Sequence, residues 1–308
     1  MKVTTRVALL VLTLAAIGST LTVFACANAQ ATYDLSSVEA WRQEREQELR
    51  APDGWLSVAG LFFLKPGVNT IGSAPDSHIM LPADVAPARA GTVTFDGHRA
   101  VLAMRIGVEA RVNGKLLQGP AELTPPEEGR PAGRVVLGRL TLHLHRSGER
   151  LAMRLRDPDH QLRRDFAGLE WFDIDPQWVI SGRFHAFPEP KPVEIANVLG
   201  DVQKAVSPGE VTASIDGQDV RLLALSEKDG QLWFVFSDAL AGTRTYRTRY
   251  LYAPAPRDGT VTLDFNRAYN PPCAYNPHTT CPLPPPQNRL KVAIAAGEKA
   301  YSGQPPTS

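Results

Sequence analysis

Short apolar runs separated by turn-forming residues dominate the chain from Gly54 onward. In the first half they lie at residues 61–64, 93–95, 100–104, 110–112, 135–144 and 151–155. In the second half they lie at residues 178–184, 193–198, 211–215, 220–225, 231–236, 245–252, 260–265 and 290–295. Runs of this length and spacing predict β-strands of a sandwich or barrel.

Glycine pairs with aspartate or asparagine divide many of these runs. The pairs are Asp96-Gly97, Asn113-Gly114, Asp216-Gly217, Asp229-Gly230 and Asp258-Gly259. Both residues of such a pair tolerate positive φ, which tight hairpin turns need. The pairs therefore predict antiparallel hairpins.

One helical segment precedes the strands, at residues 36–50. Ser36 followed by Glu39 predicts a capping box at its start, and Glu46 lies one turn from Arg50, which favours an ion pair. The apolar positions expected to face the body are Val38, Trp41 and Leu49.

The length of 308 residues suits two domains, and the polar stretch at residues 158–164 marks the boundary between them. We predict a mainly β protein with an N-terminal helix, a β-sandwich and then a second β-barrel or β-sandwich domain. The predicted divisions are 1–29 (signal peptide), 30–53 (helix and linker), 54–160 (sandwich), 161–301 (second domain) and 302–308 (disordered tail). The sequence does not predict the strand order of the second domain.

The N-terminus has the features of an export signal. Lys2 and Arg6 precede an uncharged apolar stretch, and Ala27-Asn28-Ala29 offers a small-residue cleavage pattern. We expect removal of residues 1–29 and delivery to the periplasm or cell envelope. Two alternatives stay open: an uncleaved membrane anchor, and a lipoprotein carrying its lipid on Cys26.

Composition excludes one class of partner. The formal net charge is +1, and it becomes −1 without residues 1–29, which hold Lys2, Arg6 and no acidic residue. No run of lysine and arginine stands out, so the basic footprint that nucleic-acid binding needs is missing. We predict no nucleic-acid partner, no cofactor and no metal, and membrane contact only through a lipidated Cys26 or an uncleaved leader.

The first domain contains a series of short segments at Asn69–Ser73, Asp76, Ile79–Pro82, Ala90–Val93 and Val112–Gly114. This series resembles a forkhead-associated (FHA) sandwich. The resemblance implies the sandwich fold of that family.

The phosphate-reading residues of FHA domains are missing from this resemblance. Ser73 stands where those domains have an arginine, while Ala86 or Pro87, and Ala90, replace their serine and histidine. Phosphate binding needs charged or well-placed donors. We therefore expect the fold without phosphothreonine binding.

Four longer segments stand out along the chain, at Gly54–Leu61, Arg164–Phe172, Asp264–Tyr275 and Cys281–Leu290. With these segments, nearly all of the chain after residue 29 resembles the domain-of-unknown-function 1684 family. It implies a shared fold and a shared motif, and it implies no activity. His278 departs from the family pattern, which more often has an aromatic residue there.

Two cysteines remain beyond the leader, Cys273 and Cys281. Because an exported chain meets an oxidising environment, we predict a disulfide between them. A metal site with His278 is the alternative, but the spacing differs from the common zinc patterns.

A polar cluster around this cysteine loop is the strongest candidate for ligand binding. Its members are Asp264, Asn266, Arg267, Asn270, Asn288 and Arg289. Two arginines can hold a carboxylate, a phosphate or an acidic sugar with forked hydrogen bonds. The alternative is structural: the asparagines cap turns beside proline, and Arg267 pairs with Asp264.

Other candidates are weaker. His143 and His145 fall on the same face of a predicted strand, where a metal pair or an exposed sheet face would both fit. Trp171, Phe172 and Trp178 could stack on a sugar, although large aromatic residues are more often core residues.

We predict a non-catalytic binding module of the cell envelope for a small anionic or carbohydrate ligand. One alternative is a hydrolase of an envelope substrate that uses Asp165, Glu170 or Asp264 as general acid or base. Another is a purely structural envelope protein. The chain lacks the common catalytic motifs, which leaves catalytic residues unassigned.

Overall fold

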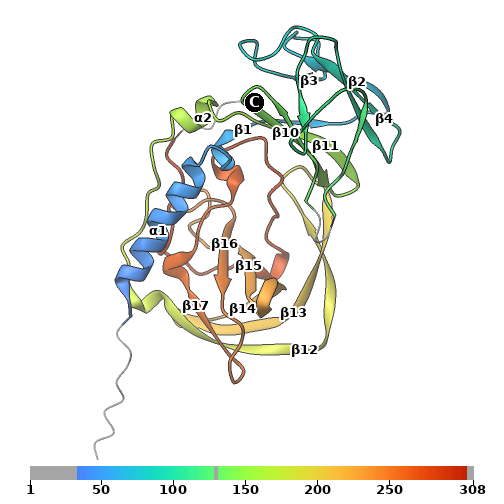
Figure 1. Cartoon of the computed structure of the whole chain (residues 1–308). Helices are drawn as coiled ribbons and strands as arrows, with labels where there is room; N and C mark the ends of the chain where they lie inside the picture. The colour runs from blue at the N-terminus through green and yellow to red at the C-terminus, as the bar shows by residue number, and fades with distance from the viewer. Residues whose placement is uncertain (1–32, 128–130, 304–308) are drawn as a thin grey trace, which may run out of the picture. The chain divides into compact units, whose positions relative to one another are not determined.

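The computed structural model describes residues 33–127 and 131–303 (Figure 1). The predicted leader at residues 1–29 and residues 304–308 of the predicted tail lie outside these ranges. None of the helices within them is long and apolar enough to cross a membrane. The described residues from Asp34 onward form one compact unit, and the predicted domain limits within it stay a prediction.

Helix α1 (Leu35–Arg50) begins one residue earlier than predicted. Its N-cap is Asp34, whose carboxylate accepts the backbone N–H of Ser37 at 3.2 Å, so the predicted capping box is wrong. The Asp34 carboxylate takes the N-cap position that the prediction gave to the Ser36 hydroxyl. The Ser36 hydroxyl instead donates a hydrogen bond to Asp34. The predicted pair of Glu46 with Arg50 is confirmed at 2.9 Å.

Two sheets form the sandwich of the first half. The six-stranded sheet has the order β1 (Val58–Phe63), β11 (Arg150–Arg156), β10 (Leu140–Ser147), β9 (Arg134–Leu137), β6 (Arg111–Val112) and β7 (Lys115–Leu116). The five-stranded sheet has the order β3 (Ile79–Met80), β2 (Gly67–Gly72), β4 (Gly91–Phe95), β5 (Ala100–Met104) and β8 (Ala121–Leu123).

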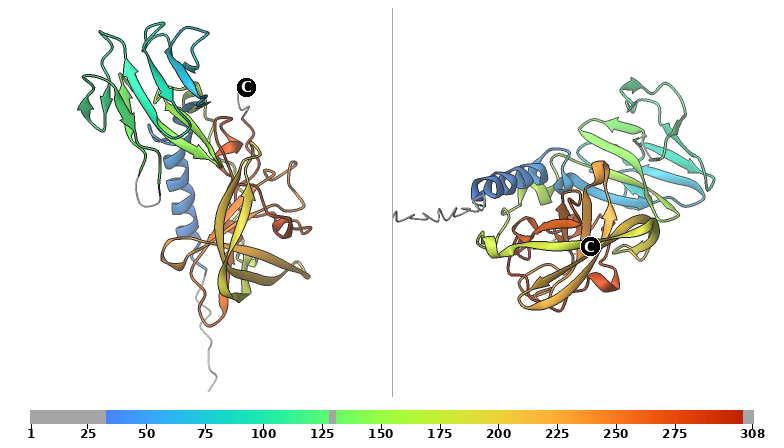
Figure 2. Two further views of the ribbon diagram at one scale, coloured as in Figure 1. Left: turned by 90° about the vertical axis from the view of Figure 1, so that its right-hand side faces the viewer. Right: turned by 90° about the horizontal axis from the view of Figure 1, so that it is seen from below.

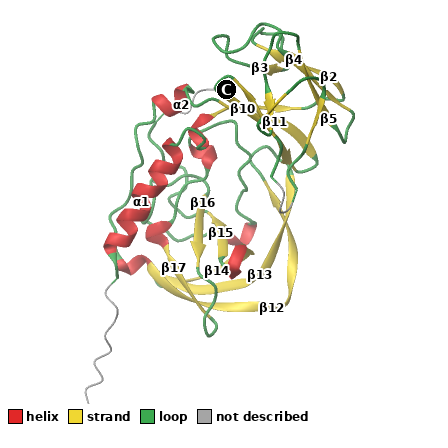
Figure 3. Ribbon diagram, in the orientation of Figure 1, coloured by secondary structure: helices red, strands yellow, loops and turns green. Residues whose placement is uncertain are grey.

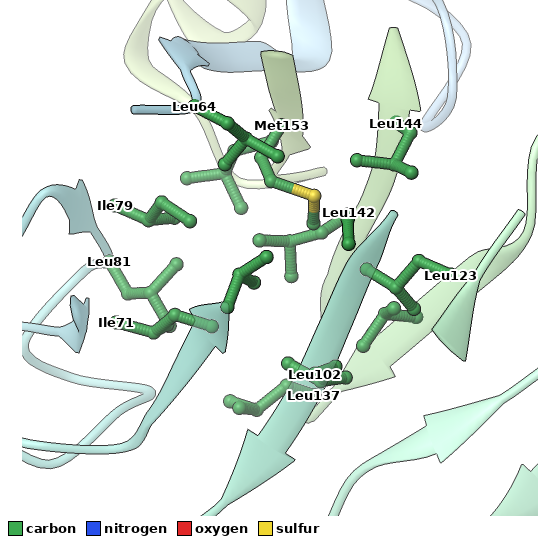
Figure 4. Packing of buried hydrophobic residues seen from close by; sticks show 14 of the residues in the cluster. Leu64, Ile71, Ile79, Leu81, Leu102, Leu123, Leu137, Leu142, Leu144 and Met153 are labelled. Carbon is green, nitrogen blue, oxygen red and sulfur yellow. The ribbon is translucent and has the colours of Figure 1, made fainter. Parts of the chain in front are cut away.

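Leucine, isoleucine and methionine side chains fill the space between these sheets (Figure 4). In strand β10, the alternation of residue types determines which side chains face the core. Leu140, Leu142 and Leu144 are buried in this core, whereas His143 and His145 alternate with them and point to the opposite face.

One curled six-stranded sheet, a half-barrel, builds the second half (Figure 3). Its order is β16 (Arg249–Ala253), β15 (Leu232–Phe236), β14 (Gln218–Ser226), β13 (Val202–Ile215), β12 (Val179–Ala196) and β17 (Thr260–Asp264). Its inner face encloses a second apolar core that includes Phe234, Phe236 and Phe265. The predicted mainly β class with one N-terminal helix is confirmed.

Hairpin turns occur at the predicted glycine pairs. Asn113-Gly114 joins β6 to β7 with φ of 51° and 81°, and Asp216-Gly217 joins β13 to β14 with φ of 49° and 70°. Two successive residues at positive φ match the twist of antiparallel strands, which is why this residue pair recurs there.

Three predicted runs differ from the strands observed. Residues 178–184 and 193–198 belong to the single long strand β12, drawn in yellow in Figure 2. A bulge between Ala186 and Lys191 accommodates Pro188 and Pro190 within this strand. The run at residues 135–144 is two strands, divided by a turn at Gly138 with φ of 56°.

Residues 290–295 form no strand. Leu290, Val292 and Ile294 are buried in the second core with the alternation of a strand, which explains the prediction. Their backbone groups form hydrogen bonds with loop residues and not with a neighbouring strand. The N–H of Leu290, for example, donates to the carbonyl of Ser237 at 2.8 Å.

Short helical turns complete the chain. They are η1 (Trp55–Ser57), α2 (Gln161–Arg164), η2 (Pro176–Trp178), η3 (Lys228–Gly230), η4 (Phe265–Arg267), η5 (Pro272–Ala274) and η6 (Pro286–Asn288).

A buried carboxylate joins α1 to the C-terminal half. Glu298 is fully buried and accepts the Arg45 Nε–H at 3.2 Å and the Asn270 side-chain amide at 2.8 Å. The Tyr275 hydroxyl donates to the same carboxylate. Burial alone would lower the pKa of Arg45, yet the nearby Glu298 charge raises it, so the guanidinium stays protonated.

Glu298→Gln should destabilise the protein strongly, because it leaves the buried Arg45 charge with the carbonyl of Asn270 as acceptor but without an anionic partner. Removing one partner of a buried ion pair costs about 3 kcal/mol or more in the free energy of unfolding. Urea unfolding measures the change. Glu122→Gln is the matched control, since its pair with Arg99 is exposed and should change the free energy of unfolding little. Equal losses in the two variants would contradict the role given to Glu298.

Candidate functional site

Structural hydrogen bonds occupy the three asparagines of the predicted ligand cluster. Asn266 is fully buried and exchanges two hydrogen bonds with the backbone of Asp175, at 2.9 and 3.0 Å. Asn270 is also fully buried, and its amide donates to Glu298 and to the carbonyl of Lys299. These amides hold chain segments together in the core.

Asn288 plays the same part at a different place in the fold. Its amide donates to the carbonyls of Leu223 and Val235 at 3.0 and 2.9 Å, and its oxygen accepts the N–H of Leu223 at 2.7 Å. It therefore joins β14 to β15.

The charged members of the predicted cluster also have protein partners. Arg267 donates to Asp264 at 3.2 Å and to the Ser37 hydroxyl at 2.8 Å. Arg289 is exposed, and its Nε–H lies 3.3 Å from the carbonyl of Pro284. Asp264 to Asn270 contact α1 and the C-terminal segment, whereas Asn288 contacts β14 and β15. The ligand-binding role of this cluster stays a prediction, and the geometry favours the structural alternative for its asparagines.

A groove beside α1 is a stronger candidate. It consists of two adjoining cavities of about 420 and 280 Å³ that share Arg45, Glu48, Tyr252 and Tyr269. The larger cavity has the size of an ordinary small-molecule site. Of the predicted ligand-binding residues, Arg267 lines this groove.

Aromatic rings line the groove. Tyr252 stacks between Trp233 and Tyr269, with ring centroids 6.2 Å apart and interplanar angles of 20° and 22°. Trp41 meets Tyr269 edge-on at 6.2 Å. Tyr252 is 40% exposed and is the ring of this stack that faces solvent, while Trp233 and Tyr269 are half-buried. We call Trp233, Tyr252 and Tyr269 the aromatic platform.

Polar groups without protein partners border the platform. Across the described ranges, the carboxylates of Glu44 and Glu48 and the amide of Gln231 have no hydrogen-bond or ion-pair partner. The indole N–H of Trp233 is enclosed and also has none. Such groups are free to bind a ligand, and an enclosed N–H without an acceptor favours one.

Sequence reasoning missed most of this groove. It assigned Trp41 to packing and left the aromatic residues of β15 and β16 unexamined. Tyr250 and Tyr252 alternate on one strand next to Trp233 of its neighbour, which a period-two pattern could have revealed. Tyr269 lies in the quoted motif, but its contact with β16 is not visible from sequence.

The two cysteines lie close together and are free thiols in the structure. The backbone N–H of Cys273 donates to the Cys281 sulfur at 3.1 Å. The hydrogen bond with Cys281, together with burial, raises the pKa of the Cys273 thiol. The disulfide stays a prediction. His278 lies in the same loop, and its backbone N–H donates to the side-chain oxygen of Asn276.

The carboxylates named for a hydrolase do not line the groove. Asp165 and Glu170 are exposed, Asp264 pairs with Arg267, and Glu170 accepts the hydroxyl of Ser302 at 2.5 Å. Of the aromatic candidates outside the groove, Phe172 is buried, Trp178 packs against the second core, and Trp171 meets Trp41 edge-on at 5.6 Å.

Comparisons with known proteins give a family match and several similar solved structures. The family model described as "Protein of unknown function (DUF1684)" matches residues 164–299. A solution structure of an uncharacterized protein of Haloarcula marismortui is 30% identical over 46% of this chain and 81% of its own, with a TM-score of 0.39. No curated protein matches.

Two structures of FHA domains are similar over 31% of this chain, each at 20% identity and a TM-score of 0.23. One is the FhaA FHA domain in complex with the intracellular domain of another protein, matched over 97% of its length. The other, matched over 92%, comes from work on phosphothreonine-dependent FHA domain interactions.

Asn288→Ala should lower stability by about 2 kcal/mol or more, because it leaves three buried backbone groups of β14 and β15 without partners. Arg289→Ala, the neighbouring control, should stay within about 0.5 kcal/mol, since that side chain is exposed. Thermal and urea unfolding measure both. A stable Asn288→Ala variant would contradict the structural role.

Proposed function

The chain belongs to the DUF1684 family of proteins of unknown function, and we propose that it is a non-catalytic binding protein whose groove beside α1 takes a carbohydrate ligand. The observation that carries this proposal is the exposed aromatic platform bordered by polar groups without partners.

The platform suits the apolar face of a sugar ring. A stack of rings with nearly parallel planes offers a rigid flat surface, and burying such surface favours binding at little cost in side-chain freedom. Trp233, Tyr252 and Tyr269 hold one another in place, and Arg45 lies over the Tyr269 ring at 4.1 Å. The platform is therefore formed before a ligand arrives.

The polar groups of the groove favour a neutral ligand over an anion. Glu44 and Glu48 can each accept hydrogen bonds from hydroxyl groups, and Gln231 can both donate and accept. The guanidinium groups nearby are already occupied: Arg45 by Glu298, and Arg267 by Asp264. An anion would meet two free carboxylates and few free donors, so carbohydrate is the better of the two predicted ligand classes.

Catalysis has less support than binding. A glycoside hydrolase places two carboxyl groups on opposite sides of the bond it cuts, one with a raised pKa. Glu44 and Glu48 are one turn apart on the same helix and so lie on one wall of the groove. Where carboxyl pKa values depart from ordinary values in the described ranges, the shift is downward, as at Asp157 and Asp201.

The proposed binding belongs to the cell envelope. The basic start, the apolar stretch and the small-residue cleavage pattern of residues 1–29 support export. Oligosaccharides are abundant ligands on that side of the membrane.

Tyr252→Ala should weaken carbohydrate binding about tenfold, because it removes the most exposed ring of the platform. Isothermal titration with cellotriose and chitotriose, alongside Trp233 fluorescence, measures the affinity. Phe187→Ala is the control, since its ring packs with Lys191 outside the groove. Glu48→Gln should weaken binding less, because an amide keeps one acceptor.

Two results would contradict the proposal. One is the absence of heat and fluorescence change for both sugars at millimolar concentration. The other is binding that Tyr252→Ala and Phe187→Ala weaken equally.

A further inference from the structure

A buried arginine outside the groove has no counter-charge. Arg154 lies on β11 and is 5% exposed. Across the described part of the chain it donates no hydrogen bond and forms no ion pair, and its Nε–H is enclosed without an acceptor. Among the described residues it contacts the ring of Trp55, whose centroid lies 5.3 Å from the guanidinium carbon. A buried charge in this condition is costly unless something pairs with it.

Two neutral histidines flank this arginine. His143 of β10 is directly opposite Arg154 in the ladder, and His145 lies two residues further along the same face. Burial, helped by the charges of Arg154 and Arg156, lowers the pKa of His143 to about 4. Burial and the Arg154 charge lower the pKa of His145 to about 3. Both imidazoles are therefore uncharged at pH 7. His145 is hydrogen-bonded through Nε2 to the Thr280 hydroxyl at 2.9 Å, whereas His143 has no hydrogen-bond partner among the described residues and can donate one N–H.

Further positive charge lies along the same face. Arg156 lies opposite Thr141 in the ladder, two residues along each strand from the pair of Arg154 and His143. It donates to the carbonyls of Asp53 and Gly54 at 2.5 and 2.6 Å, and no carboxylate pairs with it within the residues described.

A cavity of about 400 Å³ opens at this end of the face. Arg134, Arg156 and Thr141 line it, together with Asp53 and Arg139. Asp157 and Asp84 already neutralise Arg139. Arg154 and His143 are not among its lining residues, so the cavity reaches this face at Arg156, which lies two residues from Arg154 on β11.

We propose that this face of β10 and β11 binds a small oxyanion, a phosphate or sulfate group, with Arg154 as its main ligand and His143 and Arg156 beside it. A tetrahedral oxyanion accepts the forked hydrogen bonds of guanidinium groups and supplies the missing counter-charge. The site faces away from the sandwich core. Its proposed ligands Arg154, His143 and Arg156 do not line the groove beside α1, although Trp55 contacts Arg154 and also lines that groove. It also differs from the phosphate-reading positions at Ser73, Ala86 and Ala90.

One competing partner for Arg154 is on the same side. The Cys281 thiol acts to raise the pKa of Arg154, so a Cys281 thiolate would be its counter-charge in place of an oxyanion. Cys281→Ser separates these alternatives, since serine removes the thiolate and leaves an anion site intact.

The test is thermal unfolding of the protein at pH 7 in inorganic phosphate or sulfate, with sodium chloride matching the ionic strength. The melting temperature should rise with the logarithm of phosphate concentration in the wild type and in Cys281→Ser. Arg154→Met should remove this rise, and Arg146→Met, an exposed arginine of the neighbouring strand, should keep it. Glucose 6-phosphate in a parallel titration distinguishes a phosphate ester from the free ion.

A second measurement covers the case in which Arg154→Met fails to fold. Arg154→Lys keeps the positive charge but cannot form the paired hydrogen bonds of a guanidinium group, so it should weaken phosphate binding at least tenfold. In NMR titrations of the wild type, phosphate should raise the pKa of His143 from about 4, because an adjacent anion favours imidazolium. His143 is surrounded by Arg134, Arg154, Arg156 and His145, so this shift reports on the anion directly.

The proposal is overturned if phosphate raises the melting temperature no more than chloride does. It is also overturned if Arg154→Met and Arg146→Met respond alike, or if Cys281→Ser loses the response.

Discussion

The carboxylate of Glu298 holds the C-terminal half in position. It is fully buried, and it neutralises Arg45 of α1 while binding Asn270 and Tyr275 of the motif loop. A buried charge survives only when its partners satisfy it, so helix, loop and C-terminal segment must come together at once. The groove depends on these contacts. Arg45 fixes the helix that forms one wall of the groove, and the Tyr269 ring beneath Arg45 forms its floor.

The fold was largely visible in the sequence, because alternation and turn residues act locally. The ladder of β5 coincides with the predicted run at residues 100–104, and the glycine pairs turn where expected. Residues 290–295 show the limit of that reasoning. They alternate between core and surface as a strand does, yet the partners of their backbone are loop residues that no local pattern reveals.

The candidate site could be predicted only in part, because hydrogen bonding is decided by distant residues. An asparagine in a polar motif looks available for a ligand, but Asn288 is bound to Leu223, 65 residues away. Conversely, Arg154 lies in an ordinary strand pattern, and only the fold shows that no carboxylate of the described residues pairs with it. Sequence identifies which groups could bind, and tertiary structure decides which are still free to do so.

The proline-rich stretch of β12 has a consequence for solubility. β17 covers the outer edge of β12 over residues 179–183, Phe184 donates to the carbonyl of Gly259, and Leu283 donates to the carbonyl of Ala196. The outer edge at residues 185–195 has no ladder partner in the described structure. An open edge invites a strand from another molecule, and such pairing is the first step of aggregation. Pro188, Pro190 and Pro192 have no N–H to offer, and Lys191 adds a charge between them. The residues that force a bulge in this strand therefore also keep neighbouring molecules from extending the sheet.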